Sequence, residues 1–240
     1  QSIANAGAVI VRWGATGKGL SNPRNPTLLS LYAPGGQAQA HADDRFGYAL
    51  AAGDFNGDGR EDLAVGMSNF NSDEGGVQIH YGEPGGIQLA GEHLFHSGAN
   101  ANIPDPPGTY DALGASLAAG DFDGDGYDDL AIGAPQFYNF GDPMPIEGGA
   151  VVVLHGGVGG LMPVVGYLIH QDDPPVPDAG ENLDDFGWAL AAGNFNGDFR
   201  FAPGGGIYPI DDLAMSAPGE DGIGAVMVML GSEFGLIFSN

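Results

Sequence analysis

The sequence predicts an all-β protein built from β-propeller-type blades, each a four-stranded antiparallel meander repeated about three and a half times. Short apolar runs of strand length alternate with turn-forming residues along the 240-residue chain. The 44 Gly and 17 Pro fall between these runs rather than in one tract, which indicates turns and not disorder. The same order of signals recurs every 65–75 residues or so, a period typical of propeller blades with loop insertions.

Each repeat opens with Phe or Leu followed by Gly and continues with four predicted strands. The opening dipeptides are residues 46–47, 113–114 and 186–187. The first strands are small and apolar, at 48–53, 115–120 and 188–193. The second strands end in Gly-Met, Gly-Ala-Pro or Ser-Ala-Pro at 66–67, 133–135 and 216–218. The third strands start at Gly76, Gly149 and Gly224, and fourth strands lie near 94–96 and 168–170.

The two ends of the chain are out of phase with the repeat. Residues 7–11 match a third strand and residues 28–32 a fourth, while the last unit stops at 235–238, where its fourth strand should begin. We therefore expect a single domain over 1–240, divided into a half blade (1–32), two blades (46–96 and 113–170) and a blade with an incomplete last strand (186–240). Unpaired strand edges at both ends predict that the chain does not close a ring alone. The alternatives are a small ring closed by residues 28–32, a ring shared between chains, and a fragment of a longer protein.

Two nearly identical loops, residues 54–63 and 121–130, join first and second strands and have the spacing of a cation site. Oxygen-bearing side chains stand at loop positions 1, 3, 5 and 9, Gly follows at position 6, and position 7 would offer a backbone carbonyl. The candidate ligands are Asp54, Asn56, Asp58, Arg60 and Asp62 in the first loop and Asp121, Asp123, Asp125, Tyr127 and Asp129 in the second. All-oxygen ligands favour calcium over zinc, and magnesium rarely takes an all-protein cage.

The loops are not EF-hands, because position 12 is Val65 or Ile132 instead of Glu, and the flanking segments read as buried strands. A third loop is degenerate. Asn194, Asn196 and Asp198 begin the pattern, but an insertion at 199–209 delays Asp212, the counterpart of position 9. We expect a weak, remodelled or empty site there, and hence two calcium sites.

The Phe-Gly openings, the Asp-x-Asp-x-Asp-Gly-x-x-Asp-Leu loops and the Gly-Ala-Pro endings resemble the FG-GAP repeat of integrin α-subunit propellers. The resemblance recurs three times in order and covers most of the chain. It implies a β-propeller with calcium in the loop between the first and second strands of a blade. Such propellers usually have seven blades, more than this chain can form.

Composition narrows the function classes. Lys and Arg number 6 against 31 Asp and Glu, a net charge of −25, which excludes the basic footprint of a nucleic-acid binder. No apolar stretch is long enough for membrane insertion. The start at Gln1-Ser2 without Met reads as a processed or trimmed terminus, and together with the acidic excess it favours an extracellular or cell-surface location.

No nucleophile, zinc-protease or phosphate-loop motif is present, so we expect no enzyme. A weaker alternative is an enzyme acting on polysaccharide through a carboxylate pair among Asp172, Asp173, Asp178 and Glu181.

A meander places the first-to-second and third-to-fourth turns at one edge of each blade and the other connections at the opposite edge. The long connections, at 33–45, 97–112, 136–147 and 171–185, should therefore face away from the cation loops, and long loops on a rigid scaffold commonly carry recognition. The aromatic residues that could contact a protein or glycan ligand there are Tyr110, Phe137, Tyr138 and Phe140. The same rings could instead cover the propeller edge.

Two function classes follow: a binding or adhesion module that presents loops to a protein or glycan partner, and an assembly subunit whose half-blade ends pair with another chain. In either class the calcium would rigidify its loop and neutralise carboxylates, or, with an open coordination position, bridge to a ligand.

Overall fold

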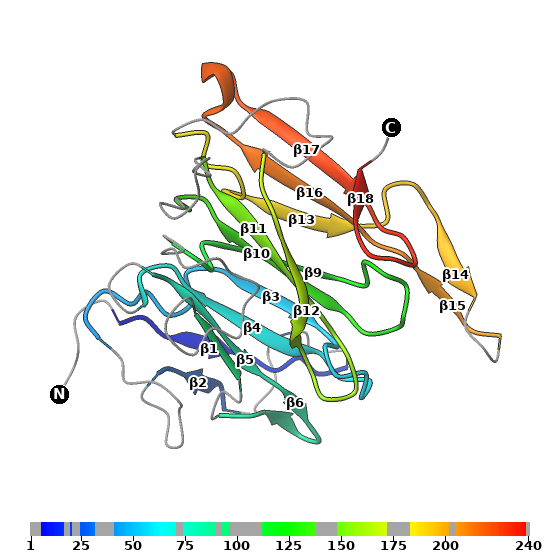
Figure 1. Cartoon of the computed structure of the whole chain (residues 1–240). Helices are drawn as coiled ribbons and strands as arrows, with labels where there is room; N and C mark the ends of the chain where they lie inside the picture. Colours follow the sequence, from blue (N-terminus) through cyan, green and yellow to red (C-terminus); the bar gives the residue numbers. More distant parts are fainter. Residues whose placement is uncertain are drawn as a thin grey trace.

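The computed structural model describes residues 6–16, 20, 25–31, 41–70, 74–89, 93–96, 112–137, 148–171, 183–201 and 205–238. These residues form three four-stranded antiparallel sheets and three two-stranded ones; the four-stranded sheets and the pair of β1 and β2 lie one beside the next in a row (Figure 1). The predicted all-β fold with propeller-type blades is confirmed. Within the described ranges, no helical segment has the length and hydropathy that a bilayer crossing requires.

Each blade follows the chain order of its strands. The first blade consists of β3 (Leu50–Gly53), β4 (Asp62–Met67), β5 (Gly76–His80) and β8 (His93–His96). The second consists of β9 (Ser116–Gly120), β10 (Asp129–Ala134), β11 (Ala150–His155) and β12 (Met162–Ile169). The third consists of β13 (Leu190–Gly193), β16 (Asp212–Ala217), β17 (Ala225–Leu230) and β18 (Ile237–Phe238).

In the last blade, β18 pairs with β17 through Met229 and Phe238 and supplies a short fourth strand. The half blade is the pair β1 (Val9–Val11) and β2 (Thr27–Leu29). Two hairpins decorate the blades: β6 (Gly82–Glu83) with β7 (Gly86–Ile87), and β14 (Phe199–Phe201) with β15 (Ile207–Pro209). A 3-10 turn, η1 (Glu220–Gly222), precedes β17. The unit boundaries between these strands stay predictions.

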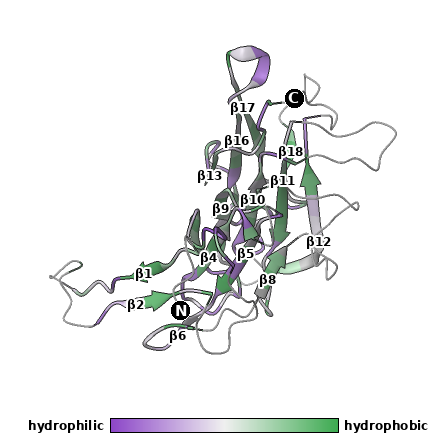
Figure 2. Cartoon of the chain, turned by 90° about the vertical axis from the view of Figure 1, so that its left-hand side faces the viewer, coloured by the Kyte–Doolittle hydropathy of each residue, from purple (hydrophilic) through white to green (hydrophobic). Residues whose placement is uncertain are grey.

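The core lies between the sheets, and β11 shows how alternation builds it. Side chains of a strand point to opposite faces in turn. Val152 and Leu154 pack toward the first blade, whereas Val151 and Val153 pack toward the third. A further cluster joins the half blade to the first blade through residues such as Val9. The strands accordingly carry most of the hydrophobic colour in Figure 2.

The Phe-Gly or Leu-Gly dipeptide that opens each unit contacts the preceding unit. Phe46, Leu113 and Phe186 are buried, and they bridge to the glycines that precede or begin the third strand of the preceding unit, at Gly7, Gly75 and Gly149. The Gly that follows each of them adopts a positive φ, between 82° and 89°, which an L side chain rarely tolerates. The motif therefore forms part of the contact between neighbouring blades.

Candidate cation sites

The first two cation loops have the same internal hydrogen bonds. In the second loop, the N–H of Asp125 donates to Asp121 Oδ1 and to Asp123 Oδ1, both at 3.0 Å, and the N–H of Gly126 donates to Asp121 Oδ2 at 2.9 Å. The first loop repeats this pattern from Asp58 and Gly59 with distances of 2.7–3.0 Å. The backbone thus holds the side chains at positions 1 and 3 turned toward the centre of the loop before any ion binds.

The Asp at position 9 ties each loop to the third strand of its blade. Asp62 and Asp129 are both 1% exposed, and Asp212 is fully buried. In each, Oδ2 accepts the N–H of the Phe at position 2, at 2.7–3.1 Å, and Oδ1 accepts the N–H of a Gly after the third strand, at 2.8–2.9 Å. Each carboxylate oxygen keeps a second lone pair that could reach a cation.

The electrostatics of the first two loops favour a bound cation. Burial raises the pKa of Asp121 to about 7, and the neighbouring Asp129, Asp123 and Asp125 add to the rise. Burial likewise raises the pKa of Asp62 to about 6, with the Asp54 carboxylate contributing. Carboxylate oxygens of Asp121, Asp123 and Asp125 lie within 4.8 Å of one another. A divalent ion would remove this repulsion, and the all-oxygen donor set of these loops fits calcium.

In the third loop, side-chain amides donate hydrogen bonds to oxygens of the loop itself. Asn194 Nδ2 donates to the carbonyl of Asp198 at 2.6 Å, and Asn196 Nδ2 donates to Asp198 Oδ2 at 2.8 Å. N–H groups therefore point to where the other loops present oxygens. The insertion that delays Asp212 folds as the β14–β15 hairpin, in which the rings of Phe199 and Phe201 meet edge to face.

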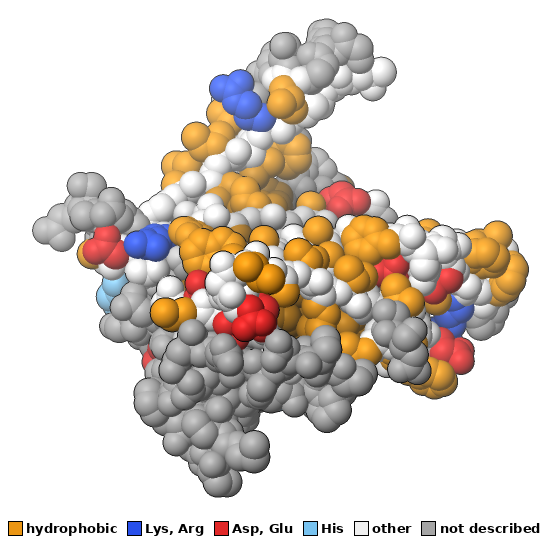
Figure 3. Space-filling view, turned by 90° about the horizontal axis from the view of Figure 1, so that it is seen from above, with side chains coloured by type: hydrophobic (Ala, Val, Ile, Leu, Met, Phe, Trp, Pro, Cys, Tyr) orange, Lys and Arg blue, Asp and Glu red, His pale blue; other side chains and the backbone are white. Residues whose placement is uncertain are grey.

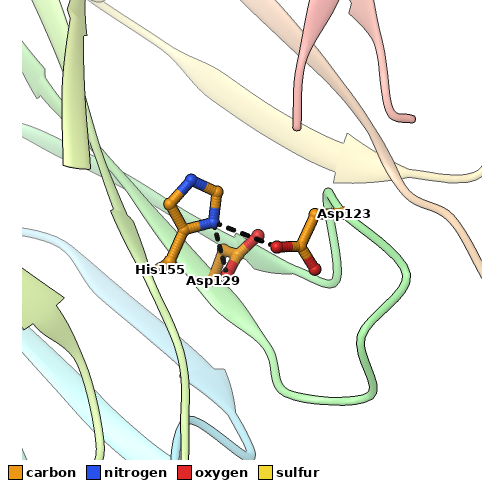
Figure 4. A group of neighbouring side chains, drawn as sticks. All are labelled: Asp123, Asp129 and His155. Atoms are coloured by element: carbon orange, nitrogen blue, oxygen red, sulfur yellow. Dashed lines mark ion pairs between the residues drawn. The ribbon is translucent and has the colours of Figure 1, made fainter. Parts of the chain in front are cut away.

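A histidine side chain lies against the second loop, although the ligand spacing gave no reason to expect one there. His155 Nδ1 lies 3.3 Å from Asp129 Oδ1 and 3.5 Å from Asp123 Oδ2 (Figure 4). Its contact with the Asp129 carboxylate raises the pKa of the imidazole above the ordinary value, against the opposing effect of burial. The signal in the sequence was its place, directly before the Gly whose N–H binds Asp129.

Position 8 of the loop links neighbouring blades, and sequence reasoning assigned it no role. The Asp128 carboxylate accepts the N–H of Asp54 at 2.8 Å, and the Asp128 N–H donates to the Asp54 carbonyl at 3.1 Å. Asp211 repeats the contact one blade later, where its N–H donates to the Asp121 carbonyl at 2.8 Å. The start of each of the first two cation loops is therefore hydrogen-bonded to the next blade.

The prediction that four aromatic residues face a ligand is wrong for one of them. Phe137 is 1% exposed and belongs to the core between the first and second blades, because its ring completes the apolar layer after β10. It cannot contact a ligand on the surface. Tyr110, Tyr138 and Phe140 lie outside the described residues, as do Asp172, Asp173, Asp178 and Glu181 and most of the long connections.

Two other aromatic residues line a cleft at the blade edge opposite the cation loops. Tyr48 precedes β3 and Trp188 precedes β13, and each is 52% exposed. Both border a cleft of about 570 Å³ whose other lining residues are mostly polar or small, and the Arg45 guanidinium lies 5.8 Å from the Tyr48 ring centroid. The available signal was an aromatic residue directly after the opening dipeptide in two of the three units.

Residues 46–80 and 113–154, which contain the first two cation loops, match the family model described as the FG-GAP repeat. The chain carries FG-GAP repeats. It is 31% identical to integrin alpha-PS2 of Drosophila melanogaster over 246 residues, which cover 89% of this chain and 15% of that protein. It is 36% identical to integrin alpha-5 of Xenopus laevis over 141 residues, 56% of this chain and 12% of that protein.

A relative with an enzyme's name matches a shorter segment of the chain. Phosphatidylinositol-glycan-specific phospholipase D of Rattus norvegicus is 42% identical over 95 residues, which cover 38% of this chain and 10% of that protein. The chain thus spans no more than 15% of the length of each of these three relatives.

Proposed function

We propose that this chain is a calcium-stabilised FG-GAP module that acts in adhesion or binding at the cell surface or outside the cell, without catalysis of its own. One observation carries the calcium assignment: two loops hold their side-chain oxygens in the same hydrogen-bonded arrangement, and burial together with mutual repulsion raises the pKa of Asp62 and Asp121. The integrin α-subunits among its relatives support the adhesion class.

The ions act on structure in this proposal. Asp54, Asn56, Asp58 and Asp62 hold the first ion and Asp121, Asp123, Asp125 and Asp129 the second, with the carbonyls of Arg60 and Tyr127 as further ligands. Each ion bound only by the folded chain adds about 2.7 kcal/mol at a hundredfold excess over its dissociation constant. Because the next blade fixes the start of each loop, an ordered loop also fixes the contact between blades.

Calorimetric titration of calcium into the chelator-treated chain tests this proposal. We expect at least two binding events, and a lower melting temperature in chelator than in calcium. Asp125→Ala should lower the calcium-saturated melting temperature more than Asp198→Ala, because the amides of Asn194 and Asn196 already occupy the carbonyl and one carboxylate oxygen of Asp198. A folded chain that takes up no calcium would refute the central assignment.

The cleft that Tyr48 and Trp188 border is the binding face we propose for a protein or glycan partner. Exposed aromatic rings beside a guanidinium suit stacking on a sugar or packing against a side chain. Screening of the labelled chain on a glycan array and on immobilised extracellular matrix proteins tests it. Trp188→Ala should abolish any binding found there and leave the melting temperature unchanged, whereas Phe195→Ala, which is 57% exposed at the cation edge, should preserve it. Equal binding by both variants would place the partner elsewhere.

Exposed apolar residues favour a second candidate, assembly with another chain or domain. On the outer side of the third blade Val226 is 70% exposed, Val228 38% and Ile237 49%, while Ile10 (64%) and Leu28 (61%) are exposed on the half blade. Figure 3 looks onto the third-blade end and shows a band of hydrophobic side chains across it. Light scattering over a range of concentrations decides: mass that rises with concentration and falls on Val226→Lys supports assembly, and a constant mass near 24.5 kDa opposes it.

A further inference from the structure

The three blades differ at one position beside their cation loops. The residue before the Gly that donates to the position-9 Asp is Tyr81 in the first blade, His155 in the second and Leu230 in the third. The backbone hydrogen bond is the same in all three, so the side chain at this position is not required for it. Only the second blade places a nitrogen donor here.

The nitrogen of His155 converges with two carboxylate oxygens. One ligand atom each of His155, Asp129 and Asp123 lies within 4.8 Å of the other two, and the dashed lines of Figure 4 join the His155 nitrogen to both carboxylates. The His155 side chain is 15% exposed and Asp129 1%. Among the described residues, none offers Nδ1 a partner in hydrogen-bonding geometry, although the atom is buried.

The separations match those around a small divalent ion. Zinc binds His nitrogen and carboxylate oxygen at roughly 2.0–2.2 Å in a tetrahedron, so neighbouring ligand atoms stand about 3.3–3.5 Å apart. The two measured nitrogen-to-oxygen distances are 3.3 and 3.5 Å. Imidazole nitrogen is a common zinc ligand, whereas calcium takes oxygen almost exclusively.

The other carboxylate oxygens are already held in place. Asp123 Oδ1 accepts the N–H of Asp125 at 3.0 Å, and Asp129 Oδ2 accepts the N–H of Phe122 at 3.1 Å. Such outer hydrogen bonds orient metal ligands and typically change metal affinity by about 10–100-fold when lost. The two oxygens nearest to His155 are thus presented in fixed directions.

We propose that the second cation loop is a zinc-type site, in which His155 Nδ1, Asp123 and Asp129 bind a borderline divalent transition-metal ion in competition with calcium. This inference rests on the proposed function only in taking the loop as a cation site. The ion shares Asp123 and Asp129 with the calcium site, so one ion excludes the other. In the first blade, Asn56 stands in the place of Asp123 and Tyr81 in the place of His155. The first loop therefore stays a calcium site.

Titration of zinc into the calcium-free full chain, against a chromophoric chelator, tests the proposal. His155→Leu installs the residue of the third blade, and Asp123→Asn installs the residue of the first loop, so both replacements already occur beside the same turn. We expect each to weaken the tightest zinc site by about tenfold or more. Cobalt should give a visible absorption band of nitrogen–oxygen coordination in the wild type that His155→Leu abolishes, and calcium should displace it. Zinc affinity that neither replacement changes, or no zinc binding to the folded wild type, overturns the proposal.

Calcium titrations on the same variants separate this inference from the proposed function. His155→Leu should bind calcium as the wild type does, because it removes no oxygen ligand. Calcium binding without zinc binding overturns the zinc site alone. Zinc binding without calcium binding overturns the calcium assignment and the competition between the two ions, and leaves the zinc ligands as proposed. Thermal melts confirm that each variant is folded, and Asp123→Asn carries the test if His155→Leu is not.

Discussion

The same pair of backbone hydrogen bonds is accepted in all three blades by the position-9 carboxylate, whatever ion binds nearby. These carboxylates belong to Asp62, Asp129 and Asp212. The sequence predicted them as ligands from spacing alone, since a carboxylate at position 9 of such a loop can reach the cation. It could not show that both oxygens also accept backbone N–H groups, because the donating Gly follows a strand 19 to 27 residues further along the chain. The role of His155 was hidden for the same reason.

Asp212→Ala should destabilise the chain in chelator and in calcium alike. It leaves the buried N–H of Gly231 and the partly buried N–H of Phe195 without their acceptor, and an unsatisfied buried group costs about 1–3 kcal/mol. Asp198→Ala, in the same loop, should cost less than about 1 kcal/mol, because Asp198 is only half-buried and its partner Asn196 reaches solvent. Urea unfolding of both variants measures the difference, and equal losses would contradict it.

The raised pKa values of Asp62 and Asp121 predict a pH dependence that calcium reverses. The ordinary pKa is 3.8, and the folded values are about 6 and about 7. The folded, metal-free chain therefore binds more protons than the unfolded chain, so this stability is complete below pH 4 and is lost as the pH rises through 6 and 7. In chelator the melting temperature should be lower at pH 8 than at pH 5. In saturating calcium the slope should reverse, since the ion requires ionised carboxylates.

The variant Asp121→Asn serves as the control for this prediction, because its amide does not titrate. Its chelated form should show a shallower fall in melting temperature between pH 5 and pH 8. A wild-type slope that is flat in chelator, or unchanged in Asp121→Asn, would show that these carboxylates do not govern the pH response.

At the scale of the element, the blades are held by close backbone contacts that only small residues permit. A Cβ placed on Gly133 of β10 would lie 2.2 Å from the Gly187 carbonyl oxygen, and one on Gly66 of β4 would lie 2.2 Å from that of Gly114. The second strand thus needs Gly wherever the opening turn of the next blade rests on it. The corresponding residue of the third blade is Ser216.

Gly133→Ala should therefore destabilise the chain by about 1–3 kcal/mol, the usual cost of overpacking. Gly159→Ala is the matched control, since its Cβ would meet nothing within 4 Å and its φ is not positive. That control should be close to neutral. Comparison of the two melting temperatures in calcium checks the prediction, and equal shifts would mean that the neighbouring blade yields freely.

Across the whole molecule, the repeat was the part of the fold that the sequence predicted best. Strand order, antiparallel pairing and the row of blades follow from motifs such as 113–114 and 133–135, which are local and recur. The contacts between blades, such as Asp128 with Asp54, could not be predicted, because they join residues 74 positions apart and depend on how one sheet lies on the next. The burial of Phe137 was missed for the same reason: it is set by the neighbouring blade and not by its own loop.

The net charge is −25, and the clustered carboxylates of the cation loops add local repulsion in the metal-free molecule, which gives a last prediction. Monovalent salt screens exposed charges over about 10 Å at 0.1 M and about 3 Å at 1 M, so it should relieve part of this repulsion. The melting temperature in chelator should rise as sodium chloride increases from about 0.02 to 0.5 M. With calcium saturating the loops the rise should be smaller, because the ions already neutralise the closest carboxylates. A fall in melting temperature with salt in chelator, or equal responses in the two conditions, would show that the loop carboxylates do not dominate the electrostatic free energy of the fold.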